Sequence, residues 1–149
     1  MVKIRLKVVD IEDVELKRLG KEPNIFTRIF VLISYQRKDG DFLTRRAILD
    51  TGAIVSILPA SIWKQLDIDV IGYHSIKGIV KKESCLLPVK ICLVKNKLID
   101  EFGNETKIFK SLIYCASSND VPVIFGIKDG LDKFKLNLDI KQKDAWLIN

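Results

Sequence analysis

Residues 47–59 read Ala-Ile-Leu-Asp-Thr-Gly-Ala-Ile-Val-Ser-Ile-Leu-Pro, so an acid, a hydroxyl and a glycine interrupt an apolar stretch at Asp50, Thr51 and Gly52. The apolar runs on both sides are typical of buried strands. Burying an ionised carboxylate without compensating contacts is strongly unfavourable. Asp50 is therefore either satisfied by many hydrogen bonds or placed there for chemistry, and it is the first candidate functional residue.

This stretch resembles the active-site loop of the retropepsin-like aspartic proteases of prokaryotic type, single-lobe relatives of pepsin. Their catalytic strand ends in Asp-Thr/Ser-Gly-Ala/Ser. Here Ala53 follows the glycine, Ser56 stands where the family carries a small hydroxyl residue, and Pro59 opens a predicted short helix that includes Ile62, Trp63 and Leu66. The resemblance implies an all-β, closed, barrel-like lobe with one or two short helices.

A second stretch with the same resemblance runs from Val121 to Gly126, followed by a predicted short helix and a last strand over 135–140. In the family an apolar-apolar-Gly strand passes beside the catalytic loop, which makes Ile124, Phe125 and Gly126 the expected strand on the cleft floor. The two motifs cover residues 42–140. Residues 1–41 match only weakly, as an N-terminal extension of a single domain that spans 1–149.

The resemblance also implies a role for each residue of the first motif. Asp50 would be the catalytic carboxylate, a base in one subunit and an acid in the other. Thr51 would hydrogen-bond across a dimer axis, Gly52 would permit the tight turn and orient the carboxylate, and Ala53 would keep the cleft wall low. An Asp-Gly turn whose acid caps the loop is the alternative for Asp50.

Aspartic protease chemistry needs two carboxylates, one ionised to take a proton from water and one neutral to donate to the scissile carbonyl. Two unit charges roughly 4 Å apart repel by about 4 kcal/mol at an effective dielectric constant of about 20, so such a pair retains one proton. The chain has a single Asp-Thr-Gly, and Asp39-Gly40 and Asp129-Gly130 look like turns. We therefore predict a homodimer whose twofold axis passes between two Asp50 residues.

The family covers its cleft with a β-hairpin flap, which we expect within residues 71–80. Its predicted members are Gly72, Tyr73, His74, Ser75, Ile76, Lys77 and Gly78. A fixed surface hairpin explains these residues equally well. Only a hairpin that moves would exclude water and order a substrate.

Viral members of the family carry an acid after the Gly-Ala of the first motif and an arginine after the second motif, and these form an ion pair that braces the dimer. Here the two positions are Ile54 and Ile127. Replacing a buried ion pair by packing is energetically reasonable. This replacement predicts a different dimer contact. The N-terminal segment and residues 146–148 are candidates for it. For Trp146 the alternative is packing in the core of its own chain.

Composition narrows the function classes. The net charge of +6 is spread along the chain, which favours a solvated surface and no nucleic-acid partner. His74 is the only histidine, so the sequence predicts neither a metal nor a cofactor, and a Ser-His-Asp triad or a cysteine nucleophile is disfavoured. Cys85, Cys92 and Cys115 lack the spacing of a disulfide framework, which indicates reduced thiols. With no long apolar run or signal peptide, we expect a cytoplasmic protein without a membrane partner.

The resulting hypothesis is an aspartic endopeptidase that hydrolyses a peptide or protein substrate with water activated by two Asp50 carboxylates. The alternative is a catalytically silent dimerisation or peptide-binding module of the same fold. Pattern and turn signals predict strands over 3–9, 27–35, 42–49, 86–93, 107–115 and 145–148. The apolar residues within 10–24 fit neither the period of a helix nor that of a strand, so this segment is expected to form a polar connection.

Overall fold

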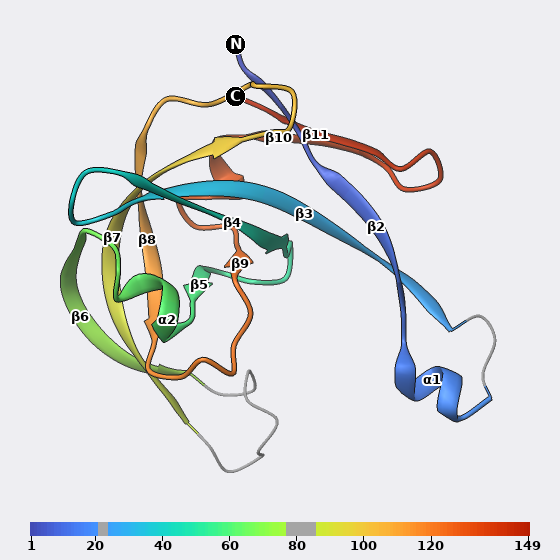
Figure 1. Cartoon of the computed structure of the whole chain (residues 1–149), viewed down its shortest axis with the longest axis horizontal. Helices are drawn as coiled ribbons and strands as arrows, with labels where there is room; N and C mark the ends of the chain where they lie inside the picture. The colour runs from blue at the N-terminus through green and yellow to red at the C-terminus, as the bar shows by residue number, and fades with distance from the viewer. Residues whose placement is uncertain (21–23, 77–85) are drawn as a thin grey trace.

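The computed structural model describes residues 1–20, 24–76 and 86–149, which are mostly β-structure with two short helices (Figure 1). None of its helices has the length and hydrophobicity to span a lipid bilayer. The strands are β1 (Lys3–Arg5), β2 (Lys7–Glu12), β3 (Ile25–Gln36), β4 (Phe42–Leu49), β5 (Ser56–Leu58), β6 (Ile68–Ile76), β7 (Leu87–Ile99), β8 (Phe109–Ala116), β9 (Ile124–Phe125), β10 (Lys135–Asp139) and β11 (Asp144–Ile148). The helices are α1 (Val14–Arg18), α2 (Ala60–Trp63) and the 3-10 turn η1 (Leu131–Lys133).

The larger sheet has the order β2-β3-β4-β9-β5-β8-β7-β6. Strand β7 also pairs with β3, where Leu32 to Tyr35 face Asn96 to Ile99, so the path of paired strands returns to β3. Alternation along each strand turns one set of side chains inward. Ile33, Tyr35 and Val94 are almost wholly buried there and form part of the main core.

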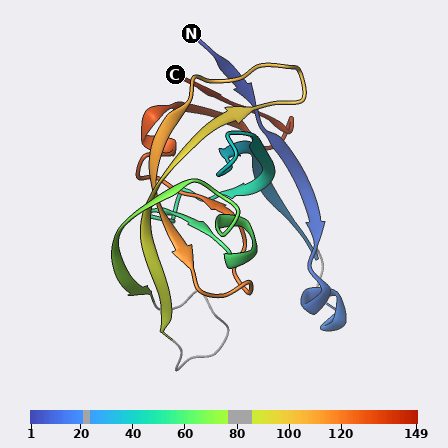
Figure 2. The same cartoon turned by 60° about the vertical axis from the view of Figure 1, so that its left-hand side comes forward.

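A smaller sheet, in the order β1-β11-β10, brings the two chain termini together (Figures 1 and 2). Ile4 of β1 and Leu147 of β11 are fully buried against the main core. Trp146 is half-buried, and the Lys3 ammonium lies 4.0 Å from the centre of its ring. The C-terminal segment therefore packs within its own chain through Ala145 and Leu147, whereas Trp146 is not part of the core cluster.

The expected strands are present, with different limits. The expected strand 3–9 is divided into β1 and β2, which belong to different sheets. Strands β3 and β7 are longer than expected, since both cross the larger sheet and pair on two sides. Pro59 is the N-cap of α2 and not its first helical residue.

The expectation of a polar connection over residues 10–24 is wrong for most of its length. Strand β2 continues to Glu12, and α1 follows, with the Asp13 side chain accepting a hydrogen bond from the Leu16 amide at 3.0 Å. Ion pairs from Lys17 to Glu12 and from Arg18 to Glu15 support this helix. No residue of α1 is buried, so its sequence carries no core-facing periodicity to detect.

Two of the three cysteines lie in the described part of the chain, and both are buried and unpaired. Burial raises the pKa of Cys92 and of Cys115, which keeps both thiols protonated and unreactive. The expectation of reduced, packed thiols is confirmed for this pair. Cys85 lies outside the described residues.

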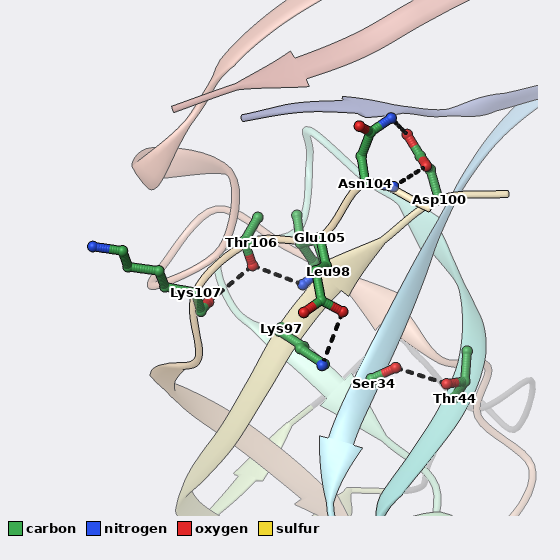
Figure 3. A network of polar contacts seen from close by, with 9 residues as sticks. All are labelled: Ser34, Thr44, Lys97, Leu98, Asp100, Asn104, Glu105, Thr106 and Lys107. Carbon is green, nitrogen blue, oxygen red and sulfur yellow. Dashed lines mark hydrogen bonds and ion pairs between the residues drawn. The ribbon is translucent and has the colours of Figure 1, made fainter. Parts of the chain in front are cut away.

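Asp100 organises the turn after β7 (Figure 3). One carboxylate oxygen accepts from the amides of Phe102 and Asn104, and the other accepts from the Arg5 amide and the Asn104 side chain, each at 2.9 Å. Burial opposes its ionisation, but these hydrogen bonds outweigh burial and hold the pKa of Asp100 below its ordinary value of 3.8. The turn is thereby tied to β1, in the smaller sheet.

Replacing Asp100 by Asn is expected to lower the free energy of unfolding by about 1–3 kcal/mol, because an amide nitrogen would then face hydrogen-bond donors. Since the pKa of the folded state is the lower one, the carboxylate stabilises the fold above the unfolded pKa, and this contribution is lost as the pH falls through the folded value. Urea unfolding of wild type and variant at pH 7 and at about pH 3 measures both effects. Asp139→Asn, at an exposed acid that accepts only from the Gln142 amide, is the control and should change little.

Candidate active site

The two motifs found in the sequence lie side by side in the structure. Strand β4 pairs in parallel with β9, Ile48 with Ile124 and Leu49 with Phe125. The Asp50 amide continues this ladder with a hydrogen bond to the Phe125 carbonyl at 3.0 Å. Strand β9 also pairs with β5 on its other side, so it separates the strands that lead into and out of the Asp50 loop.

The Asp50 side chain is half-buried at the end of β4. Its Oδ1 accepts a hydrogen bond from the Gly52 amide at 2.8 Å, and its carbonyl accepts one from the Ala53 amide at 3.2 Å. A Cβ at position 52 would lie 3.2 Å from Oδ1, so a glycine leaves the carboxylate room to lie against the turn. The loop therefore holds one carboxylate oxygen in a fixed direction.

Gly126 fixes the Asp50 loop from the second motif. A Cβ at this position would lie 2.5 Å from the Val55 carbonyl oxygen and 2.9 Å from that of Ala53, closer than any side chain tolerates. The Ser56 hydroxyl accepts from the Gly126 amide at 3.0 Å. Two further backbone bonds follow, from the Ile127 amide to the Ala53 carbonyl at 2.9 Å and from the Lys128 amide to the Ile54 carbonyl at 2.8 Å.

A cavity of about 550 Å³ opens beside the Asp50 loop. The loop and β5 form one wall, β6 supplies a second, and β8 and β9 contribute a residue each. The lining residues are Asp50, Gly52, Ala53, Ile54, Val55, Ile57, His74, Ser75, Ile76, Tyr114 and Ile124. The site thus places one carboxylate at the edge of a mainly apolar groove.

The predicted flap and floor residues do not all line the cavity. His74, Ser75 and Ile76 line the cavity from β6, whereas the Tyr73 side chain is 77% exposed and lies with Trp63 and Pro88 around a separate hollow. On β9, Ile124 lines the cavity and Phe125 is buried in the core. Gly72 lies on β6 outside the cavity lining, and Lys77 and Gly78 lie outside the described residues.

Sequence reasoning missed two apolar positions and one aromatic residue of the cavity wall. Val55 and Ile57 follow the loop directly, and Tyr114 comes from β8. The parallel register of β5 with β8, which pairs Ile57 with Tyr114, brings these residues to one place. The His74 ring then packs edge-on against Tyr114, with 5.9 Å between ring centroids. A parallel pairing between segments so far apart leaves no local signal in the sequence.

The remaining Asp-Gly pairs serve as turns, as expected. Asp39 accepts a hydrogen bond from the Asp41 amide at 2.9 Å. Asp129 adopts a positive φ of 53°, and its carboxylate accepts from the Leu112 amide at 3.0 Å. That hydrogen bond, with Lys128 nearby, holds the pKa of Asp129 below its usual range. Among the residues that the structure describes, Asp50 is the acid that lines this cavity.

The outward surface of the Asp50 loop is apolar and exposed. Ile54 is 79% exposed and Ile127 is 41% exposed, and the bond from Lys128 to the Ile54 carbonyl keeps their segments together. Thr51 and Gly52 are also exposed. An isolated chain leaves the surface next to its candidate catalytic residue uncovered.

Comparisons with protein-family models, curated proteins and solved structures found no match to this chain. Within the described ranges, no three histidine, cysteine or acidic side chains come together in a way that could hold a metal ion. The site is therefore interpreted from its own geometry.

Gly126→Ala is expected to lower the free energy of unfolding by about 3 kcal/mol, because the added methyl group must displace two carbonyl groups of the Asp50 loop. Gly72→Ala is the matched control, since a Cβ there would meet only the Ile91 side chain, at 3.5 Å. Chemical denaturation of both variants measures the difference. Equal stabilities would show that the close approach at Gly126 does not constrain the loop.

Proposed function

We propose that this chain is one subunit of a homodimeric aspartic endopeptidase of the retropepsin-like kind. The observation that carries the proposal is a single Asp50 carboxylate, oriented by the Gly52 amide and held by the close approach of Gly126, at the edge of an apolar groove. A structural turn needs no such groove. An acid that only capped its loop would gain nothing from standing beside the exposed Thr51 and Ile54.

The strand pairing supports a closed, barrel-like lobe as the proposed fold. The path from β3 through β4, β9, β5, β8 and β7 returns to β3, and the Asp50 loop emerges where β9 enters between β4 and β5. Because the path of paired strands closes on itself, few strands have an unpaired edge, and the strands that carry the loop are held on both sides. The lobe thus acts as a rigid support for a loop that must be placed accurately.

The proposed reaction uses one Asp50 from each subunit. The ionised carboxylate takes a proton from a water molecule, whose oxygen attacks the carbonyl carbon of the peptide bond, while the protonated carboxyl donates to the carbonyl oxygen. The tetrahedral intermediate then breaks its C–N bond as the carboxyl that took the water proton passes it to the nitrogen, and the other carboxylate recovers its proton from the hydroxyl as the carbonyl forms again.

The cavity lining suggests how an extended peptide would lie. Ile57, Ile76 and Ile124 offer apolar walls to side chains, and Asp50 belongs to the same lining. Strand β6 provides the wall from which the predicted flap would continue. A second lobe related by a twofold axis would extend the groove on the other side of the scissile bond.

Asp50→Asn is expected to abolish peptide cleavage without unfolding the protein, because the amide still accepts the Gly52 hydrogen bond but cannot take a proton from water. Cleavage of a diverse peptide library, assayed by mass spectrometry across pH about 3 to 8, measures this. Asp39→Asn, the same substitution at an acid that also precedes a glycine, should retain wild-type cleavage. Activity that survives in Asp50→Asn would exclude the mechanism.

Mixing wild type with Asp50→Asn tests whether the dyad is shared between subunits. After subunit exchange in an equal mixture, about one quarter of the dimers carry two intact acids, so activity per total protein should fall to about one quarter of the wild-type value. If each chain worked alone, activity would fall only to about one half. Titrating the variant against a constant wild-type concentration separates the two curves.

The alternative, a silent module that binds peptides or joins two copies, is kept apart by the same variants. If this alternative holds, the wild-type protein cleaves no peptide. It binds peptides, and Asp50→Asn binds them equally well. Fluorescence anisotropy of labelled library peptides reports that binding. Cleavage by wild type that is lost in Asp50→Asn would reject this alternative.

A further inference from the structure

Strand β2, helix α1 and residues 25–29 of β3 form an arm whose base packs on the core through Val8 and Ile29 and whose tip projects from the body of the protein (Figure 1). Strand β3 pairs with β4 only from Phe30 to Gln36, and its first part, residues 25–29, pairs with β2 alone. Helix α1 stands at the tip, where none of its residues is buried. Both views show this two-stranded ribbon and its helix projecting away from the rest of the chain (Figures 1 and 2).

The strand register places the base of this arm beside the Asp50 loop. Ile48 pairs with Phe30, so β4 turns into the loop at the point where β3 loses β4 as a partner. Because β3 and β4 are antiparallel, β3 read backwards from Phe30 to Ile25 runs in the direction in which β4 was heading. The arm therefore extends past the loop, and residues 25–29 alone span roughly 17 Å.

The tip of the arm is apolar and uncovered. Val14 is 74% exposed, Leu19 is 63% exposed and Ile25 is 56% exposed, and Leu16 lies at 36%. Single exposed apolar side chains are ordinary, but four of them gather on this one short projection. A five-residue helix is also marginal on its own. Both features indicate that the tip packs against another surface.

We propose that the arm clasps the second copy of this chain in the homodimer, with Val14, Leu16, Leu19 and Ile25 packed on that copy beyond the Asp50 loop. The inference rests on the proposed function, since that function puts a second lobe in the space past the loop, where the arm points. A stable interface buries about 1,200–2,000 Å² in total, and Ile54 with Ile127 from each chain fall well short of that. Two arms, related by the twofold axis, supply the missing area.

The loop residues Ile54 and Ile127 are apolar and exposed, so they offer a contact of the same kind as the arm tip. A contact made by apolar residues at the loop and again at the arm tip needs no charged brace, and it avoids the cost of burying charges. The twofold axis makes the arrangement reciprocal, because each chain both gives an arm and receives one. Formation of the active site and docking of the arms then become one event.

The test is the dimer dissociation constant of a tip variant, Val14→Asp with Leu19→Gln, measured by sedimentation equilibrium. The constant is expected to rise by roughly tenfold or more. The matched control is Phe102→Asp with Ile108→Gln, at positions that are 75% and 51% exposed outside the arm and the loop, and it should leave the constant unchanged. Circular dichroism and thermal unfolding check that both variants fold. An unchanged constant in a folded tip variant overturns the clasp.

A photo-crosslinking amino acid at position 19 tests the contact directly. Unlabelled and isotope-labelled chains are mixed and irradiated. We expect a covalent dimer that joins one unlabelled and one labelled chain. The same photo-crosslinking group at position 102 should give no such dimer. Larger crosslinked assemblies, or no crosslinked dimer, contradict the proposal.

Peptide cleavage, measured separately, keeps the two proposals apart. Dimers that depend on the arm but cleave no peptide would overturn the endopeptidase function and leave the clasp standing. Wild-type cleavage that needs Asp50, together with an unaltered dissociation constant in the tip variant, would overturn the clasp and leave the endopeptidase function standing. A wild-type chain that remains monomeric would overturn both.

Discussion

The candidate site depends on one close backbone contact, the approach of Gly126 to the carbonyl groups of Ala53 and Val55. It lets β9 enter between the strands before and after the Asp50 loop, so the loop is bonded on both sides to a single short strand. A side chain of any size would separate the two segments. Ser56 then satisfies the Gly126 amide, which would otherwise be a buried donor without a partner.

This contact holds a loop whose outer surface has not been covered by its own chain. Ile54 and Ile127 remain exposed although the backbone beneath them is tightly bonded. A rigid backbone beneath an exposed apolar surface suits a symmetric interface. The free chain then need not reorganise before it associates, which lowers the free-energy cost of binding. The rigidity of the lobe and the exposure of its loop are thus two parts of one arrangement.

The sequence predicted those parts of the fold that are recorded locally. The Asp50 loop, the Gly126 strand and the strands β4, β8 and β11 follow from apolar runs that end in turn residues. It did not predict that Phe125 would face the core while Ile124 faces the cavity, because a two-residue strand has no pattern of its own. Nor did it predict Tyr114, which reaches the cavity through a parallel pairing between distant segments. Register between such segments is a property of the whole sheet.

There is a physical reason why the sequence did not predict the strand and helix within residues 10–24. Periodicity in a sequence records burial, because alternating or helical patterns arise where one face of an element contacts apolar surface. Helix α1 buries nothing in its own chain, so Val14, Leu16 and Leu19 could not repeat at a core-facing spacing. Val14, Leu16 and Leu19 are exposed apolar residues at a capped helix, and the proposed clasp rests on that exposure. The exposed apolar residues of the arm and of the Asp50 loop would both be covered in the proposed twofold dimer.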